Sequence, residues 1–164
     1  MSNAGRRFNP QLKMSKKILA QNKEGGFSHD ITERFEAGVV LSGPEVKSVK
    51  AGQISLKGSY VSIGANNRAY LVNAYIAPYK PAKGAQVGYQ PDQRRGLLLH
   101  KKELNYLRGK SKEKGLTIIP TSVYNMNGLI KLEIALAKGR KQADKREAIR
   151  NREIKRQIQR SLKR

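Results

Sequence analysis

The last 27 residues constrain this chain most, because they cannot contribute to a hydrophobic core. Residues 138–164 hold twelve Lys or Arg against three acidic residues, a net charge of +9. Their large apolar side chains are few. Ile154, Ile158 and Leu162 are spaced by four, and Ile149 lies roughly 140° away on a helix that turns about 100° per residue. We expect this segment to be disordered when free, because its like charges repel, and helical on a dense polyanion such as folded RNA.

The basic charge extends beyond this tail. The whole chain carries +22, of which residues 18–137 contribute +8, and residues 1–17 contain five basic groups and no acidic one. A basic body between two basic arms indicates a nucleic-acid-binding protein. We divide the chain into a flexible N-terminal arm (1–17, in which Ser2-Asn3-Ala4 resembles a cloning scar), one body domain (18–137) and the tail (138–164).

Several classes of protein are disfavoured by composition. The chain has no cysteine and only two histidines, which are not placed at zinc-ligand spacing, so we expect no metal and no cofactor. It has no apolar stretch of the ~20 residues that a membrane helix needs, and no leader pattern, which predicts a cytoplasmic protein. We also expect a monomer. Catalytic motifs are missing as well. His100 follows three leucines, where a histidine at the end of a buried strand is favoured over a catalytic one.

The first part of the body predicts a strand followed by a helix. Residues 35–41 alternate apolar and small or polar side chains with the period of two that is typical of strands. Residues 42–52 contain the signals that begin and end a helix. Ser42 and Gly43 precede Pro44, Glu45 lies in the first turn, and Gly52 follows the end.

The rest of the body favours short strands. We predict strands at 59–63 and 68–76, a long loop at 77–96, a short buried strand at 97–100, and a helix at 101–114 that packs through Leu104 and Leu107. Residues 116–124 and 129–137 form a hairpin about Asn127-Gly128, a pair that suits a tight turn with positive φ. The pattern indicates an all-β fold, a small OB-like antiparallel barrel with short helices and a basic C-terminal tail.

Two basic clusters are candidate RNA contacts. Arg94 and Arg95 with Lys101 and Lys102 bracket the triple leucine, where they could bind phosphates. In the tail, Asp144 with Glu147 resembles a capping box for a helix that starts near Lys145.

Four motifs also occur in order along residues 18–164. They are Phe35-Glu36-Ala37-Gly38; Pro44-Glu45-Val46-Lys47-Ser48 with Ala51-Gly52; Leu97-Leu98-Leu99-His100-Lys101-Lys102-Glu103-Leu104; and Ala137-Lys138-Gly139-Arg140-Lys141 with Asp144-Lys145-Arg146. Together they resemble the signature of the SsrA-binding protein family, also called small protein B.

This resemblance implies a function and a set of contacts. Such proteins bind the tRNA-like part of transfer-messenger RNA (tmRNA, or SsrA RNA) and deliver it to stalled bacterial ribosomes for trans-translation. The resemblance places RNA contacts at Glu36, Leu98, His100 and Lys131. It places the tail in the decoding centre and messenger channel of the small subunit, with contacts at Lys138, Arg140, Lys141, Asp144, Lys145 and Arg146, to which we add Ile154 from the apolar stripe. Where the family commonly has a histidine or an aromatic residue before Asp144, this chain has Ala143, which cannot stack on a base.

Two other functions fit part of the sequence. A ribosomal protein whose basic tail threads into ribosomal RNA would have the same composition. An RNA-processing enzyme on a barrel would need a catalytic group that the sequence does not suggest.

Overall fold

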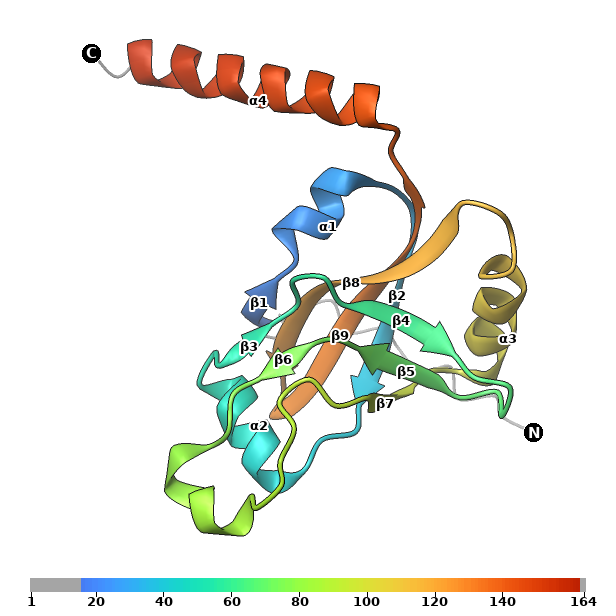
Figure 1. Ribbon diagram of the computed structural model, residues 1–164, viewed down its shortest axis with the longest axis vertical. Coiled ribbons are helices and arrows are strands. Elements are labelled where there is room, and N and C mark those ends of the chain that lie inside the picture. The colour runs from blue at the N-terminus through green and yellow to red at the C-terminus, as the bar shows by residue number, and fades with distance from the viewer. Residues whose placement is uncertain (1–15, 163–164) are drawn as a thin grey trace, which may run out of the picture.

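The structure, a computed structural model, is mostly antiparallel sheet with a few helices (Figure 1). It describes residues 16–162, with the backbone alone at 83, 142–145 and 148, so most of the predicted N-terminal arm lies outside the described residues. The strands are β1 (Lys17–Gln21), β2 (His29–Val39), β3 (Ile54–Ser55), β4 (Tyr60–Ile63), β5 (Ala69–Val72), β6 (Tyr75–Ile76), β7 (Arg95–Leu98), β8 (Leu116–Met126) and β9 (Leu129–Gly139). The helices are α1 (Lys23–Ser28), α2 (Gly43–Lys50), α3 (Lys101–Lys110) and α4 (Gln142–Ser161), with short 3₁₀ turns over Lys80–Ala85.

Seven strands pair in the order β1-β8-β4-β5-β7-β2-β9, and every pairing is antiparallel, as predicted. Because β8 also pairs with β9, six strands form a closed hydrogen-bonded circuit, and β1 lies outside it. β1 and β4 share one edge of β8: β4 pairs at Ile118, and β1 pairs farther along, from Ser122 to Asn125. The short strands β3 and β6 form a separate pair.

The hairpin of β8 and β9 confirms the prediction from its turn. Asn127 and Gly128 have φ of 52° and 82°, the left-handed values that a two-residue hairpin turn requires. The turn sets the register, so that Tyr124 lies opposite Lys131 and Ile118 opposite Leu136. On β9, Leu132, Ile134 and Leu136 are buried on one face, as the alternation predicts.

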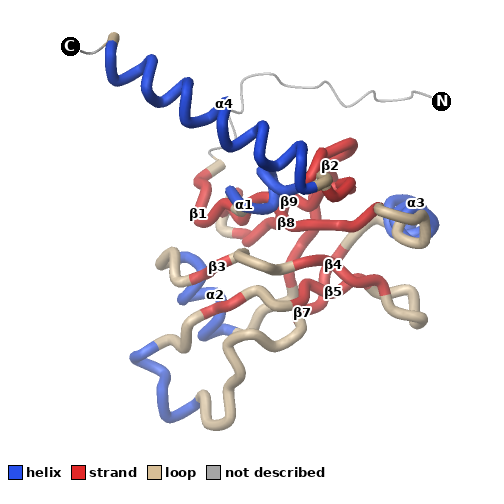
Figure 2. The backbone as a smooth tube through the Cα atoms, turned by 45° about the horizontal axis from the view of Figure 1, so that its top comes forward, coloured by secondary structure: helices blue, strands red, loops and turns tan. Residues whose placement is uncertain are grey.

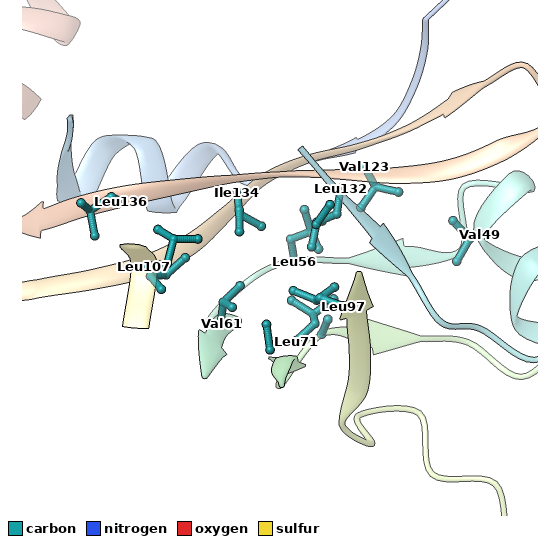
Figure 3. Packing of buried hydrophobic residues seen from close by; sticks show 14 of the residues in the cluster. Val49, Leu56, Val61, Leu71, Leu97, Leu107, Val123, Leu132, Ile134 and Leu136 are labelled. Atoms are coloured by element: carbon teal, nitrogen blue, oxygen red, sulfur yellow. The ribbon is translucent and has the colours of Figure 1, made fainter. Parts of the chain in front are cut away.

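The core lies inside the circuit of strands and receives side chains from most elements of the body. Figure 3 shows part of this cluster, in which leucines, isoleucines and valines of the strands meet Val49 of α2 and Leu107 of α3. Leu107 is fully buried and Leu104 packs at the edge, which confirms the predicted face of α3. A second, smaller cluster of Ile119, Ala135 and Ala137 lies on the other face of the hairpin. Ala135 therefore points away from the main core and is still buried.

The helix after β2 begins at the capping residues that its sequence contains. The Ser42 backbone N–H donates to Glu45 Oε2 at 2.9 Å, and the Glu45 N–H donates to Ser42 Oγ at 3.4 Å, which completes a capping box. Gly52, just past the end, has φ of 77°. The position of α2 is thus determined locally.

The segment before β2 was not predicted. β1 lacks a clear alternation and pairs with β8, while α1, with two glycines in six residues, lies against β2 and β8. Asn22 caps α1 by accepting from the Gly25 N–H at 2.8 Å, and its own amide donates to the Pro120 carbonyl at 2.9 Å. Tertiary contacts therefore outweigh weak local propensity here.

The tail is a single helix that leaves the body beside α1, as both views show (Figures 1 and 2). α4 begins at Gln142, three residues before the predicted start, and Lys141 takes the cap position. Asp144 is consequently a residue of the first turn and not the cap, which corrects that prediction. The described side chains of α4 are exposed, including Ile149, Ile154 and Ile158. Among the described residues, no helix combines the length and apolar character needed to cross a membrane.

Candidate nucleic-acid interface

Four residues that the resemblance selects, Glu36, Leu98, His100 and Lys131, line one groove, which we call the charged groove. It has a volume of about 350 Å³, and Gly38, Leu99 and Glu103 complete its lining. The side chains come from β2, the end of β7, the start of α3 and β9, so the fold unites positions that lie almost a hundred residues apart. The groove thus combines two carboxylates, one ammonium group, one imidazole and two apolar side chains.

Glu36 and Lys131 form an ion pair in this groove. Lys131 Nζ lies 3.4 Å from Glu36 Oε1, and the Tyr124 hydroxyl donates to Glu36 Oε2. The hydrogen bond from Tyr124, together with Lys131, holds the pKa of Glu36 below its ordinary value, although partial burial works in the opposite direction. Glu36 is therefore a fixed carboxylate that can accept from base amino groups.

Tyr124 was not singled out from the sequence, yet it positions Glu36. Its side chain is buried, and this burial, followed by the hydrogen bond to Glu36, raises the pKa of the Tyr124 hydroxyl. Lys16 Nζ lies 3.8 Å from the centre of the Tyr124 ring. The signal that could have found it was the hairpin register, since pairing outward from Asn127-Gly128 places Tyr124 opposite Lys131.

Replacing Tyr124 with phenylalanine should lower the free energy of unfolding by about 1 kcal/mol at pH 7, because a hydrogen bond to a carboxylate is lost. The pKa of Glu36 is lowered in the fold. The contribution of its charged form to the free energy of unfolding is therefore complete above its ordinary pKa and is lost as the pH falls through the lowered value. The difference between wild type and Tyr124→Phe in urea unfolding should therefore shrink at pH 3. Tyr60→Phe, at an exposed tyrosine, is the control. A difference that is equal at both pH values would contradict the coupling.

Leu98 is exposed, contrary to the buried strand predicted for residues 97–100. Strand β7 ends at Leu98; Leu97 points into the core with 7% exposure, while Leu98 faces outward with 64%. The neighbouring Gly38 makes room for it, since a Cβ at Gly38 would lie 3.3 Å from Leu98 Cβ. The alternation of a strand separates the two leucines, which a run of three apolar residues conceals.

His100 lies at the N-cap of α3, exposed and beside the groove. Its backbone N–H donates to Glu103 Oε2 at 3.3 Å, and both residues line the groove. Within the described part of the chain, no group of three or more His, Asp or Glu side chains is placed to hold a metal ion. The imidazole is available as a polar or stacking partner for RNA.

The prediction that Arg94 and Arg95 act together as a phosphate site is wrong for Arg95. Its side chain is 1% exposed, and all five N–H donors are used: Nε donates to Glu45 Oε1 at 2.8 Å, and the other four bond to the Tyr89 hydroxyl and to the carbonyls of Ala74, Pro91 and Gln93. Arg94 points outward, with Cζ 4.7 Å from the Tyr70 ring centre. Successive residues of extended chain face opposite ways, so within this cluster Arg94 and the exposed Lys101 and Lys102, but not Arg95, can contact phosphates.

The buried ion pair of Arg95 and Glu45 ties the long loop to α2. Burial works to raise the pKa of Glu45, but the Ser42 N–H and the Arg95 guanidinium outweigh it and hold the pKa below its ordinary value. Tyr89 and Gln93 also bond to Glu45 Oε1, at 3.2 and 3.1 Å. The loop that precedes β7, and with it Leu98, is therefore fixed from the interior.

The predicted tail residues fall into three groups. Lys138, Lys141 and Arg146 are exposed, and Ile154 is 46% exposed. Arg140 is held by the body: its Nε donates to Asp30 Oδ1 at 2.7 Å, and Nη1 donates to the Phe27 carbonyl at 3.0 Å. Asp144 and Lys145 lie where the structure describes the backbone alone. Arg140 thus fixes the point from which α4 departs, while the exposed basic residues follow it.

Comparison with known proteins finds one family over nearly the whole body and tail. The family model described as SmpB protein matches residues 19–164. An SsrA-binding protein of Sulfurihydrogenibium sp. (strain YO3AOP1) is 52% identical over 150 residues, which cover 92% of this chain and 97% of the relative. An SsrA-binding protein of Persephonella marina (strain DSM 14350 / EX-H1) is 50% identical with the same coverage.

A solved structure agrees with these relatives. It is described as "tmRNA-SmpB: a journey to the center of the bacterial ribosome", and a chain in it is 39% identical, with a TM-score of 0.59. The likeness covers 82% of this chain and 93% of that one. By sequence and by structure, this chain belongs to the SmpB family of SsrA-binding proteins.

Proposed function

We propose that this protein is an RNA-binding factor, not an enzyme, that binds the tRNA-like part of tmRNA and delivers it to stalled bacterial ribosomes for trans-translation. The observation that carries this proposal is the charged groove, in which Glu36, Leu98, His100 and Lys131 meet, in a chain of the SmpB family. The family match favours this function over that of a ribosomal protein with a basic tail, which the composition alone would also fit. Acting on ribosomes, the protein would work in the cytoplasm as a monomer.

The fold supports a division of labour. The body (residues 18–137) would bind tmRNA through the charged groove, and we assign it to the OB-like barrels because six strands close one hydrogen-bonded circuit. The tail (138–164) would enter the messenger channel near the decoding centre of the small subunit, with Lys138, Lys141, Asp144, Lys145 and Arg146 among its contacts. Free in solution, its charge favours disorder, and bound to ribosomal RNA it would be helical.

The ion pair in the groove provides a test of specificity. Binding through Lys and Arg releases counterions, so the slope of log affinity against log salt is about 0.7–0.9 per neutralised phosphate. Lys131→Ala should flatten this slope by about one contact. Glu36→Ala should weaken binding to the tRNA-like RNA without flattening the slope. The Glu36→Ala variant should bind a random RNA no more weakly than wild type does, because the substitution removes the carboxylate that pairs with Lys131.

The control is Glu113→Ala, which frees Lys110 from an exposed ion pair of 2.8 Å at the far end of α3. Affinity is measured by titration of labelled RNA at several salt concentrations. If Glu36→Ala and Glu113→Ala behaved alike on both RNAs, Glu36 would carry no specificity. If wild type bound the tRNA-like part no better than random RNA, the proposed function itself would fail.

A further inference from the structure

The turn of the β8–β9 hairpin places a side-chain amide beside an unhindered backbone nitrogen. Asn127 precedes Gly128, and the sequence contains this Asn-Gly pair once. The ladder of the hairpin ends with Met126 opposite Leu129, so both turn residues lie beyond it. Both are also exposed. Glycine has no side chain that shields its nitrogen, and its backbone changes conformation at low cost.

Two other asparagines share the left-handed conformation but have different surroundings. Asn67 has φ of 55° and is followed by Arg68, whose backbone N–H donates to the Asn66 side chain at 3.2 Å. Asn73 has φ of 59° and is followed by Ala74, which is fully buried. The nitrogen that follows the asparagine is therefore engaged or shielded at these two positions, whereas in the hairpin turn it is accessible.

The charge around the hairpin turn favours a reaction between the Asn127 amide and the Gly128 nitrogen. The reaction begins when the Gly128 N–H loses its proton, which leaves a negative nitrogen. Gly128 and Lys131 line one depression of about 290 Å³, and Lys131 is the charged member of the described residues that line it. The chain as a whole carries +22. Positive charge nearby stabilises an anion and so makes this deprotonation easier.

We propose that Asn127 is a site of spontaneous deamidation. The Gly128 nitrogen bonds to the carbonyl carbon of the Asn127 side chain, the carbon–nitrogen bond of the side-chain amide breaks, and ammonia leaves with the proton of the Gly128 N–H. The product is a succinimide ring. Water then opens the ring at either of its carbonyl groups, which gives aspartate or isoaspartate. Water is consumed and ammonia is released, and nothing is oxidised or reduced.

Both products change the surface beside the charged groove. Each places a carboxylate at the depression that Gly128 and Lys131 share. Isoaspartate also adds a methylene group to the main chain of a two-residue turn, and such turns set the register of their strands. The chemistry of the site is therefore coupled to the geometry of the hairpin.

The consequence for RNA binding rests on the proposed function. Lys131 also lines the charged groove, so a carboxylate that pairs with it competes with a phosphate of the RNA. The modified protein should bind the tRNA-like part of tmRNA about fivefold more weakly than fresh protein, the effect of one surface ion pair. The protein would thus lose affinity for its RNA as it ages.

The test follows the purified full-length protein during incubation at mildly alkaline pH. Ammonia and isoaspartate, which a carboxyl methyltransferase labels, should increase together. Mass spectrometry should locate the change at Asn127 in peptide 115–131, which trypsin releases by cleavage after Lys114 and Lys131. Asn127→Gly removes the reacting amide and keeps a pair that suits the turn. This variant should form no isoaspartate in that peptide, and it should bind RNA as fresh wild type does both before and after incubation.

Two further variants separate the position of the carboxylate from its charge. Asn127→Asp supplies the carboxylate with a normal backbone, and when fresh it should already show the loss of about fivefold. Asn66→Asp makes the same change in another exposed turn, where the side chain still accepts from the Arg68 N–H. It should weaken binding by less than about twofold, because a distant exposed charge is screened by salt.

Protein unfolded in urea provides the reference rate. If peptide 115–131 reacted in urea but stayed unmodified in the folded protein, the turn would protect Asn127 and the inference would be overturned. If modified protein and Asn127→Asp bound RNA as fresh wild type does, the consequence for binding would be overturned. The two proposals fail separately: fresh wild type that did not prefer the tRNA-like part to random RNA would refute the proposed function, whereas mass spectrometry alone decides the site.

Discussion

Arg95→Ala should lower the free energy of unfolding by about 3–5 kcal/mol, because it leaves the Glu45 carboxylate buried without its charged partner. The side chains of Arg95 and Glu45 are 1% and 3% exposed. Five hydrogen bonds of the guanidinium would be lost at once, and the carbonyls of Ala74 and Pro91 would lose a donor. Since domains of this size are stable by only about 5–15 kcal/mol, the effect is visible in urea unfolding at pH 7.

The chain contains a matched control for this prediction in the preceding residue. Arg94→Ala removes the same side chain from an exposed position against Tyr70, and it should cost about 1 kcal/mol or less. The double variant with Glu45→Ala and Arg95→Ala should lose less unfolding free energy than the sum of the losses in the two single variants. The reason is that it buries no charge without a partner. Equal costs for Arg94→Ala and Arg95→Ala would disprove the role assigned to the buried pair.

At acid pH, Arg95→Ala should lower the free energy of unfolding by less than it does at pH 7. The pKa of Glu45 is lowered in the fold, so the stability that its charged form provides is complete above its ordinary pKa and is lost as the pH falls through the lowered value. In the variant, burial without Arg95 favours a protonated Glu45. The gap in unfolding free energy between wild type and Arg95→Ala should therefore be smaller at pH 3 than at pH 7.

Removing residues 142–164 should abolish trans-translation, measured as the tagging of incomplete chains on stalled ribosomes. The affinity for tmRNA should stay within about tenfold of wild type. The truncated chain keeps the charged groove and the Arg140 anchor to Asp30 and Phe27, and it loses the whole of α4. The remaining loss of affinity reflects fewer positive charges. Tagging in a reconstituted translation system and RNA titration measure the two quantities. Full tagging by the truncated protein would refute the division between body and tail.

Two single changes locate the active face of α4. Ile154 and Ile149 are equally exposed, at 46%, but lie about 140° apart around the helix. Ile154→Asp places a carboxylate in the stripe that Ile158 and Leu162 continue, and it should reduce tagging strongly. Ile149→Asp makes the same chemical change outside that stripe and should reduce tagging less. Equal losses would mean that added negative charge, and not the apolar stripe, is responsible.

The sequence predicts elements well where local chemistry determines them. The hairpin depends on Asn127-Gly128 and α2 on Ser42 and Glu45, and both form as predicted. Segments that depend on distant partners were missed. β2 begins at His29 and not near Phe35, because pairing with β9 extends it through polar residues. β1 and α1 likewise depend on β8.

For the candidate site, the sequence identified the residues of the groove but not the orientation of every side chain. The resemblance selected four residues that the fold brings into one groove, although their contacts with RNA stay a prediction. Strand alternation decides the orientation of neighbours, and a run such as Arg94-Arg95 or Leu97-Leu98 does not reveal which member points inward. Burial of Arg95 and exposure of Leu98 follow from the position of β7 between β5 and β2, which the sequence alone did not provide.

The pairing of β2 with β9 has a consequence for the synthesis of the protein itself. β2 meets β7 only at Gly38 and Val39, and the rest of its length pairs with β9, about a hundred residues later in the chain. Until β9 has been made, β2 offers an unpaired edge, which is prone to aggregation. A nascent chain interrupted before residue 139 therefore cannot complete its fold. A factor proposed to deal with interrupted synthesis would itself be highly vulnerable to interruption.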